Sequence, residues 1–195
     1  MNVARRAKLG ECAASVIKGS VSTRSIPALR VAVEGVQRER RVGFGKRDVM
    51  FVRRIATEKD MRAFGAALAE TCPPGTVVLL RGPLGAGKTT LADGFIAALG
   101  GGHATSPTFT IAHRHDGGRM PMSHLDLFRL DGPAQVEELD LAQYLPPDGI
   151  ALVEWPERAG ETVWPADRIE ISISLDGESR NATVETFGRC VGVLT

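Results

Sequence analysis

The sequence predicts a three-layer α/β fold, in which a mixed sheet carries helices on both faces and ends in a C-terminal antiparallel hairpin. Three observations lead to this prediction. A glycine-rich loop at 82–90 joins an apolar, β-branched run to a run with helical spacing. Two later apolar runs each include an acidic residue near the end, where open α/β sheets place their ligands. Finally, 168–175 and 181–187 alternate apolar and polar residues around an Asp-Gly turn.

The glycine-rich loop fits the pattern G-x-x-x-x-G-K-[ST] at every required position, which is the signature of a P-loop that binds a nucleoside triphosphate. Gly85 and Gly87 allow turns in which backbone N–H groups approach oxygen anions closely. The helix that begins near Lys88 directs its unpaired N–H groups to the same place. We expect Lys88 to contact the β- and γ-phosphates of ATP and Thr89 to bind Mg²⁺. The predicted cofactor contacts in this loop are Gly82, Pro83, Leu84, Gly85, Ala86, Gly87, Lys88, Thr89 and Thr90.

The residues on either side of the loop fit a strand and a helix. Residues 76–81 favour a strand that leads into the loop, and 90–99 carry apolar side chains at helical spacing. Upstream, Thr57 and Asp60 fit a capping box at the start of another helix, which Cys72-Pro73-Pro74-Gly75 ends. This context makes the P-loop match more specific than the pattern alone, and it predicts the P-loop NTPase fold.

A segment rich in hydroxyl groups follows at 105–110. Its Thr108 is a candidate contact of the nucleotide, because P-loop proteins often order such a segment around the γ-phosphate. The same residues also fit the start of an ordinary strand with Ser/Thr turns. The runs 109–113 and 120–127 then flank His115-Asp116-Gly117-Gly118, which predicts a hairpin. The His113–His115 pair has no third ligand at a suitable spacing, which favours surface positions over a metal site.

Two acidic residues are the candidate catalytic carboxylates. Asp126 lies in His124-Leu125-Asp126-Leu127-Phe128-Arg129-Leu130, and Glu154 ends the apolar run of 150–156. Acids at the carboxyl edge of a sheet can bind Mg²⁺ or orient the attacking water, as in a Walker-B element. Together with Lys88 they form the predicted catalytic set, and together with Thr89 the predicted metal ligands. A structural ion pair with Arg129 is the alternative role for Asp126.

The segment between Asp126 and Glu154 is predicted to contain a helix, and its composition helps to distinguish an ATPase from a kinase. Residues 133–145 have the spacing of an amphipathic helix, which Pro146-Pro147 stops. Trp155, beside Glu154, fits either the nucleotide site or the core. Kinases of this fold close an arginine-rich lid over the phosphates, but 131–149 contains neither Arg nor Lys. This composition disfavours phosphoryl transfer to a small acceptor.

The length and the distribution of charge predict a single globular domain at 51–195 preceded by a basic extension at 1–50. The P-loop makes that domain a candidate ATPase. The first 50 residues contain 11 Lys/Arg and 4 Asp/Glu, a charge of +7, whereas the remainder holds 13 and 19, a charge of −6. An acidic domain is atypical of a free-standing nucleic-acid binder. The cysteines, Cys12, Cys72 and Cys190, suggest no disulfide framework, which favours a cytoplasmic location. No apolar run approaches the roughly 20 residues that span a bilayer.

Three interpretations of the basic extension remain open. It is a disordered or loosely attached tail, an upstream extension from a misassigned start codon with Met50 as the functional start, or an organelle-targeting peptide. The Arg-rich composition, poor in acids, is the observation that favours the targeting peptide.

Four motifs in order resemble the TsaE (formerly YjeE) family of bacterial tRNA threonylcarbamoyladenosine biosynthesis ATPases. They are Gly-Pro-Leu-Gly-Ala-Gly-Lys-Thr-Thr at 82–90, Ser-Pro-Thr-Phe-Thr at 106–110, His-Leu-Asp-Leu-Phe-Arg-Leu at 124–130 and Leu-Val-Glu-Trp-Pro-Glu at 152–157. The resemblance covers about 55–187. Phe128 stands where the family usually has Tyr, and the 1–50 extension lies outside the family pattern.

The resemblance implies a P-loop ATPase that is weakly active alone. It implies work with the TsaD and TsaB proteins, which modify adenosine 37 of tRNA, so that contact with tRNA is indirect. ATP hydrolysis would reset that assembly between turnovers. By position, Lys88 and Thr89 match the phosphate and Mg²⁺ residues, Thr108 lies in the switch-like segment, and Asp126 and Glu154 match the acidic pair. The alternatives are a small-molecule kinase and a nucleotide-gated binding module.

Overall fold

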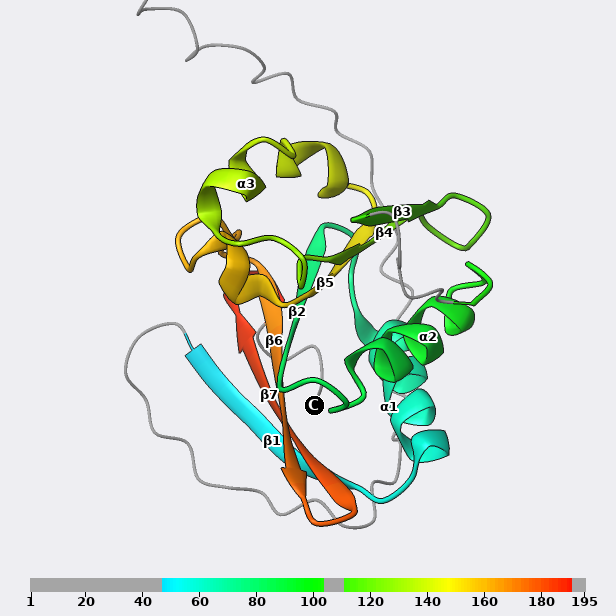
Figure 1. Ribbon diagram of the computed structural model, residues 1–195. Coiled ribbons are helices and arrows are strands. Elements are labelled where there is room, and N and C mark those ends of the chain that lie inside the picture. The colour runs from blue at the N-terminus through cyan, green and yellow to red at the C-terminus, as the bar shows by residue number, and fades with distance from the viewer. Residues whose placement is uncertain (1–46, 104–110, 191–195) are drawn as a thin grey trace, which may run out of the picture. The chain divides into compact units, whose positions relative to one another are not determined.

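The computed structural model describes residues 47–103 and 111–190, and these form a seven-stranded mixed sheet with helices on both faces (Figure 1). The strand order is β1-β7-β6-β2-β5-β4-β3. The central strands β6, β2, β5 and β4 run parallel, while β1, β7 and β3 pair antiparallel with their neighbours. The strands are β1 Arg47–Ile55, β2 Thr76–Arg81, β3 Ala112–His115, β4 Met122–Asp126, β5 Ile150–Glu154, β6 Arg168–Asp176 and β7 Ser179–Phe187. The predicted fold class and the C-terminal hairpin β6–β7 are thus confirmed.

Helices α1 (Glu58–Thr71) and α2 (Lys88–Ala98) cover one face of the sheet. The predicted capping box opens α1, since the Thr57 hydroxyl accepts from the Asp60 N–H at 3.1 Å and the Asp60 carboxylate accepts from the Thr57 N–H. Buried apolar side chains from both helices pack on every second residue of the central strands. Among them are Phe64, Leu91, Phe95, Leu80, Leu152 and Ile171.

Short helices cover the opposite face, where the prediction of one helix over 133–145 was wrong. The structure has α3 (Pro133–Glu137) and then a separate 3₁₀ helix, η1 (Leu141–Tyr144). Asp140 between them has a φ of 44°, a left-handed conformation that ends regular helix. The apolar residues still face the core, because Val136, Leu139 and Leu145 pack against the strands together with η2 (Pro156–Ala159).

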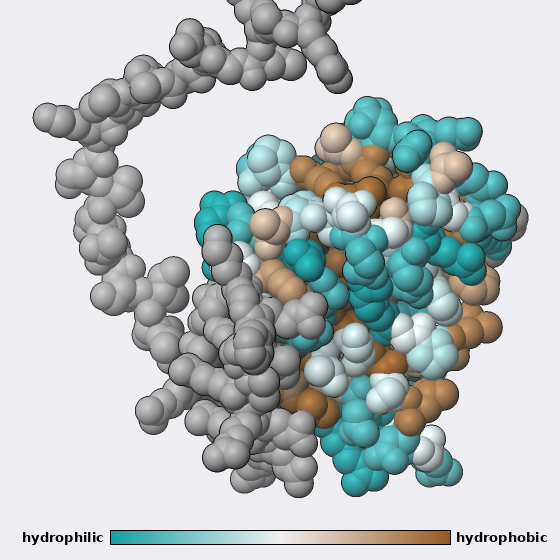
Figure 2. All heavy atoms as spheres, turned by 90° about the vertical axis from the view of Figure 1, so that its left-hand side faces the viewer, coloured by the Kyte–Doolittle hydropathy of each residue, from teal (hydrophilic) through white to brown (hydrophobic). Residues whose placement is uncertain are grey.

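Strand β1 was not predicted, and it crosses the expected domain boundary at 50/51. It pairs with β7 from Arg47 to Ile55 and extends the sheet into a three-stranded antiparallel wing of β1, β7 and β6. Ile55 is fully buried under α1. Figure 2, which views the side away from α1 and α2, shows mostly hydrophilic residues with smaller hydrophobic areas among them. The sheet therefore buries one face of this wing and presents polar residues on the other.

The structure also places two of the cysteines. Cys72 and Cys190 are buried free thiols, and burial raises the pKa of both. Cys190 lies in the short 3₁₀ helix η3 (Gly188–Cys190) that follows β7. Across 47–103 and 111–190, no helix is long and apolar enough to span a membrane.

Candidate nucleotide-binding site

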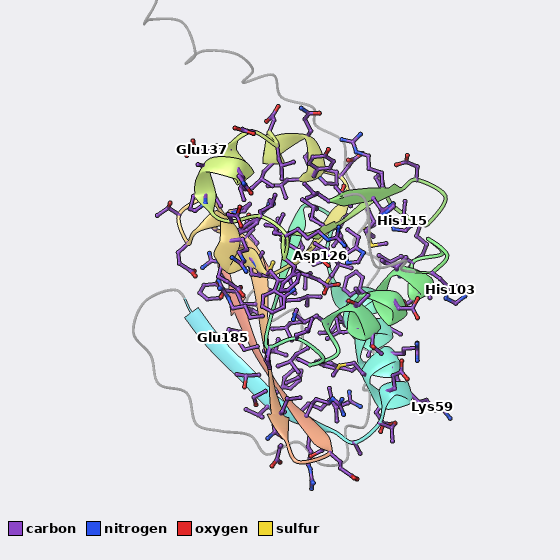
Figure 3. All side chains as sticks on the ribbon, viewed as in Figure 1. Lys59, His103, His115, Asp126, Glu137 and Glu185 are labelled. Atoms are coloured by element: carbon purple, nitrogen blue, oxygen red, sulfur yellow. The ribbon has the colours of Figure 1, made fainter. Side chains whose placement is uncertain are left out.

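The parallel strands bring the predicted site residues together at one edge of the sheet. Strand β5 lies between β2 and β4, so that Glu154 is in register with Leu80 on one side and Asp126 on the other. The P-loop continues directly from β2 and therefore begins at the same edge. In Figure 3, the half-buried Asp126 lies near the centre of the view, whereas Lys59, His103 and Glu137 lie at the periphery.

The glycines of the loop are required by its backbone. Gly82 has a φ of 142°, and a Cβ added there would lie 2.5 Å from the Ile173 carbonyl oxygen of β6. Gly87 has a φ of 99° and a Cβ there would press on Met61 of α1. Residues with side chains rarely adopt these conformations. The loop thus turns tightly over the sheet, with Pro83, Leu84 and Gly85 exposed and Ala86 buried.

The N-terminus of α2 is open to an anion. Its N-cap is Gly87, and no side chain among the described residues forms a capping hydrogen bond there, in contrast to the capping box of α1. Its first turn contains no acidic residue. The unpaired N–H groups and the positive end of the helix dipole therefore remain available to a phosphate group.

Lys88 lies folded back against its own loop. Its Nζ donates hydrogen bonds to the carbonyl oxygens of Gly82 at 2.7 Å and Pro83 at 2.9 Å, and it lies 3.7 Å from the ring centroid of Trp155. Burial lowers the pKa of Lys88, and the nearby Glu154 partly opposes that shift. The ammonium group is thus held at the site by neutral acceptors and an aromatic face, which a phosphate could replace.

Glu154, at the end of β5, contacts side chains of both α2 and β4. Its Oε2 accepts a hydrogen bond from the Thr89 hydroxyl at 3.1 Å, and its Oε1 lies 3.0 Å from Nε2 of His124. Glu154 is only 2% exposed and His124 is fully buried. The structure therefore brings Thr89 and Glu154, two of the predicted metal ligands, within hydrogen-bond distance, and it adds a histidine to the pair.

Asp126 is more accessible than Glu154. Its Oδ1 accepts a hydrogen bond from the Phe128 N–H at 3.0 Å. Burial raises the pKa of Asp126, and Glu154 adds to the increase, while the Phe128 N–H opposes it. Within the described ranges Arg129 forms no ion pair with Asp126, so the structural pair considered as an alternative is absent there.

Trp155 has roles in both the site and the core. Its φ of 58° turns the chain sharply after β5, and Pro156 then starts η2. The ring packs against the second core cluster and tilts over Phe128, with 4.9 Å between the centroids. Phe128 is 41% exposed. This aromatic pair forms the wall of the site beside the Lys88 ammonium group.

The donor set fits Mg²⁺. The Thr89 hydroxyl and the Glu154 and Asp126 carboxylates are oxygen ligands of the kind that a hard cation prefers. Across the described residues no three His, Cys, Asp or Glu side chains form a metal cluster, so such an ion would need phosphate oxygens or water as further ligands.

His113 and His115 are half-buried rather than exposed, and His115 Nδ1 lies 2.9 Å from the Gly101 carbonyl oxygen. Thr108 lies outside the described residues.

Comparison with known proteins gives the family. The family model described as "Threonylcarbamoyl adenosine biosynthesis protein TsaE" matches residues 55–183, about two thirds of the chain. The chain belongs to the TsaE family. It is 36% identical over 137 residues to the TsaE protein of Bacillus subtilis, with 69% of this chain and 85% of the relative covered. The TsaE protein of Synechocystis is 49% identical over 100 residues, which cover 49% of this chain and 63% of the relative.

A solved structure agrees with the TsaE assignment. The crystal structure of Bacillus subtilis YdiB is similar with a TM-score of 0.61 and 31% sequence identity. The match covers 73% of this chain and 89% of that one. The α/β architecture described above is therefore shared with a known structure.

One residue of this TsaE-family site was missed at the sequence level. His124 belongs to a motif that was recognised, but it received no role. The signal was its spacing: His124 and Asp126 are two residues apart on one strand, so their side chains lie on the same face. A contact with Glu154 on the neighbouring strand could not be predicted without the register of β4 and β5.

Proposed function

We propose that this chain is a Mg²⁺-dependent ATPase that supports the threonylcarbamoyladenosine modification of tRNA. The observation that carries the proposal is the meeting of four features at one edge of the sheet. They are the uncapped N-terminus of α2, the Lys88 ammonium group, the Thr89 hydroxyl and the two carboxylates. This combination suits a triphosphate and its metal ion.

Each residue has a role in this proposal. The loop at 82–90 and the first turn of α2 bind the phosphates through N–H groups, and Lys88 exchanges its carbonyl acceptors for phosphate oxygens. Thr89, Glu154 and Asp126 would hold Mg²⁺, which supplies positive charge that stabilises the transferring phosphoryl group. Asp126, the more accessible acid, also orients the attacking water.

The proposed partners are the TsaD and TsaB proteins, and contact with tRNA is through that assembly. The relatives named above carry the tRNA threonylcarbamoyladenosine biosynthesis name, which supports this setting. It would place the protein in the cytoplasm. The kinase alternative has less support, because the segment 131–149, which contains α3 and η1, has no Lys or Arg of its own to close over the phosphates.

The test is ATP hydrolysis and nucleotide affinity of the full chain, with and without purified TsaD and TsaB. Lys88→Ala should raise the Kd for ATP by about tenfold or more, because a charged contact to phosphate is lost. Glu154→Ala should leave the Kd within about threefold and lower the hydrolysis rate by about a hundredfold. Partner proteins should increase turnover of the wild type.

Matched controls are available on the surface. Lys59→Ala in α1 and Glu137→Ala in α3 remove the same side-chain types at exposed positions away from the site. Both should behave as the wild type. Hydrolysis at the wild-type rate by Glu154→Ala, or no hydrolysis by the wild type under any of these conditions, would refute the proposal.

A further inference from the structure

We infer that His124 is a positioning residue, which fixes the orientation of the Glu154 carboxylate through a hydrogen bond made below the site. This inference deepens the proposed ATPase function and rests on it. His124 is fully buried, so it cannot contact a nucleotide directly. Its Nε2 lies 3.0 Å from Oε1 of Glu154. The hydrogen bond makes Glu154 the group through which His124 acts on the site.

The direction of the hydrogen bond follows from the partners. An ionised carboxylate only accepts hydrogen bonds, so Nε2 of His124 is the donor. The other ring nitrogen, Nδ1, is buried and has no hydrogen-bond partner among the residues that the structure describes. A proton there would be an unsatisfied buried donor, whereas a bare Nδ1 is only an unsatisfied acceptor. The geometry thus selects the imidazole tautomer that carries its proton on Nε2.

The contact fixes where the second oxygen of Glu154 points. With Oε1 held by His124 from β4, Oε2 is directed to the Thr89 hydroxyl in the first turn of α2 at 3.1 Å. A glutamate side chain has three rotatable bonds, and two hydrogen bonds from opposite sides leave it little freedom. Histidines and carboxylates that orient a ligating group in this way often change activity by 10–100-fold when replaced, an order of magnitude taken from metal sites.

Burying the imidazole has a cost that core packing alone does not explain. His124 occupies the central position of β4, where Met122 and Leu152, which lie on the same face of the sheet, are buried and apolar. A leucine there would bury no unpaired Nδ1. The polar ring therefore fits a requirement of Glu154 rather than a requirement of the core.

Three substitutions of His124 test the inference by changing whether the side chain carries an N–H donor and how far that donor extends toward Glu154. His124→Gln places an amide N–H₂ near the position of Nε2, whereas His124→Asn places the same group near Nδ1, too short for Glu154. His124→Leu removes the donor. We expect His124→Gln to keep the kcat for ATP hydrolysis within about threefold, and His124→Asn and His124→Leu to lower it by about tenfold or more. The Kd for ATP should stay within about twofold in all three, because Lys88 and the loop are unchanged.

The outcomes separate this inference from the proposed function. Equal kcat values for His124→Gln and His124→Asn, or a kcat of wild-type size in His124→Leu, would overturn the positioning role while ATP hydrolysis by the wild type still stands. A wild type that hydrolyses no ATP would overturn the proposed function itself. A purely structural role would lower the unfolding midpoint in all variants without distinguishing the two amides by kcat.

A measurement on the unmodified chain covers the case in which the variants do not fold. Long-range ¹H–¹⁵N NMR of the imidazole reports which ring nitrogen carries the proton. A proton on Nε2 of His124 in the wild type supports the contact, because this nitrogen is then the donor to the Glu154 carboxylate. A proton on Nδ1 in the wild type would contradict it.

Discussion

At the scale of single residues, Lys88 and Trp155 form a contact that ATP binding is expected to break. The ammonium group lies 3.7 Å from the centre of the indole ring and donates to two carbonyl oxygens of its loop. A phosphate would offer charged acceptors in place of these neutral ones, and charge-assisted hydrogen bonds are the stronger. The indole should therefore change environment when the nucleotide binds.

This change can be measured by fluorescence. The chain has two tryptophans, Trp155 and Trp164, so Trp164→Phe leaves the site indole as the single reporter. We predict that ATP changes its emission intensity or maximum in a saturable manner, and that the response is lost in the same background with Lys88→Ala. A saturable response of equal size without the lysine would show that the contact is not what the probe reports.

Asp126 combines its proposed catalytic role with a cost to stability. Burial and the neighbouring Glu154 raise the pKa of Asp126, so its ionised form opposes folding. This penalty is fully present above the folded-state pKa, shrinks as the pH falls below that value, and is gone below the lower pKa of the unfolded state. An uncharged side chain of the same shape at position 126 should therefore make the folded protein more stable.

We predict that Asp126→Asn raises the thermal midpoint of the nucleotide-free protein near neutral pH, and that the gain shrinks in acid. ATP hydrolysis should fall by about tenfold or more, because the carboxylate is lost. Thermal unfolding across pH, together with hydrolysis assays, checks both parts. Glu137→Gln, at an exposed position on α3, is the control. A lower midpoint in Asp126→Asn would contradict the sign of the pKa shift.

At the scale of elements, α1 and α2 pack closely because each has a glycine at the contact. A Cβ at Gly94 would lie 2.0 Å from the Arg62 carbonyl oxygen, and one at Gly65 would lie 2.1 Å from that of Leu91. These are backbone atoms, which cannot move aside as the end of a side chain can. The two helices are thus held near enough for α1 to support the helix that bears Lys88 and Thr89.

Gly94→Ala should lower the free energy of unfolding by about 1–3 kcal/mol, even though alanine favours the helix by about 1 kcal/mol over glycine. Chemical denaturation measures the difference. Gly117→Ala in the β3–β4 turn, where a Cβ would meet nothing within 4 Å, is the matched control and should be nearly neutral. If Gly94→Ala were as stable as the wild type, the close helix contact would be ruled out.

The elements also show what sequence can and cannot predict. The P-loop, α1, α2, β5 and the β6–β7 hairpin follow from local signals: glycine pattern, capping residues, apolar runs and an Asp-Gly turn. The helix over 133–145 was wrong because Asp140 takes a left-handed conformation that its apolar spacing does not reveal. Strand β1 was missed because its Arg-rich sequence shows little alternation, and pairing with β7 forms it. The contact of His124 with Glu154 required the register between two strands.

At the scale of the whole molecule, the sheet extends beyond the part that matches the TsaE family model. That match covers 55–183, whereas β1 begins at Arg47 and β7 ends at Phe187. Strand β1 covers the edge of β7 along eight paired positions. Without it, β7 would present unpaired N–H and C=O groups, which promotes aggregation.

We therefore predict different outcomes for two truncated chains. A chain that starts at residue 47 retains β1, and one that starts at residue 56 lacks it together with the buried Ile55. The shorter chain should unfold at least about 2 kcal/mol more easily or be insoluble, because it loses a buried isoleucine and a strand. Denaturation and size-exclusion chromatography compare them. Equal stability of the two chains would show that β1 contributes little to the domain.

The central claim is that the loop, Lys88, Thr89 and the two acids act together on a triphosphate. A crystal structure of the full chain with Mg²⁺ and a non-hydrolysable ATP analogue tests it most directly. We predict phosphates on the loop at 82–90, Lys88 Nζ moved from the Pro83 carbonyl to a phosphate oxygen, and Glu154 and Asp126 facing the metal ion. A bound nucleotide elsewhere, or phosphates on the loop with both acids turned away from them, would contradict it.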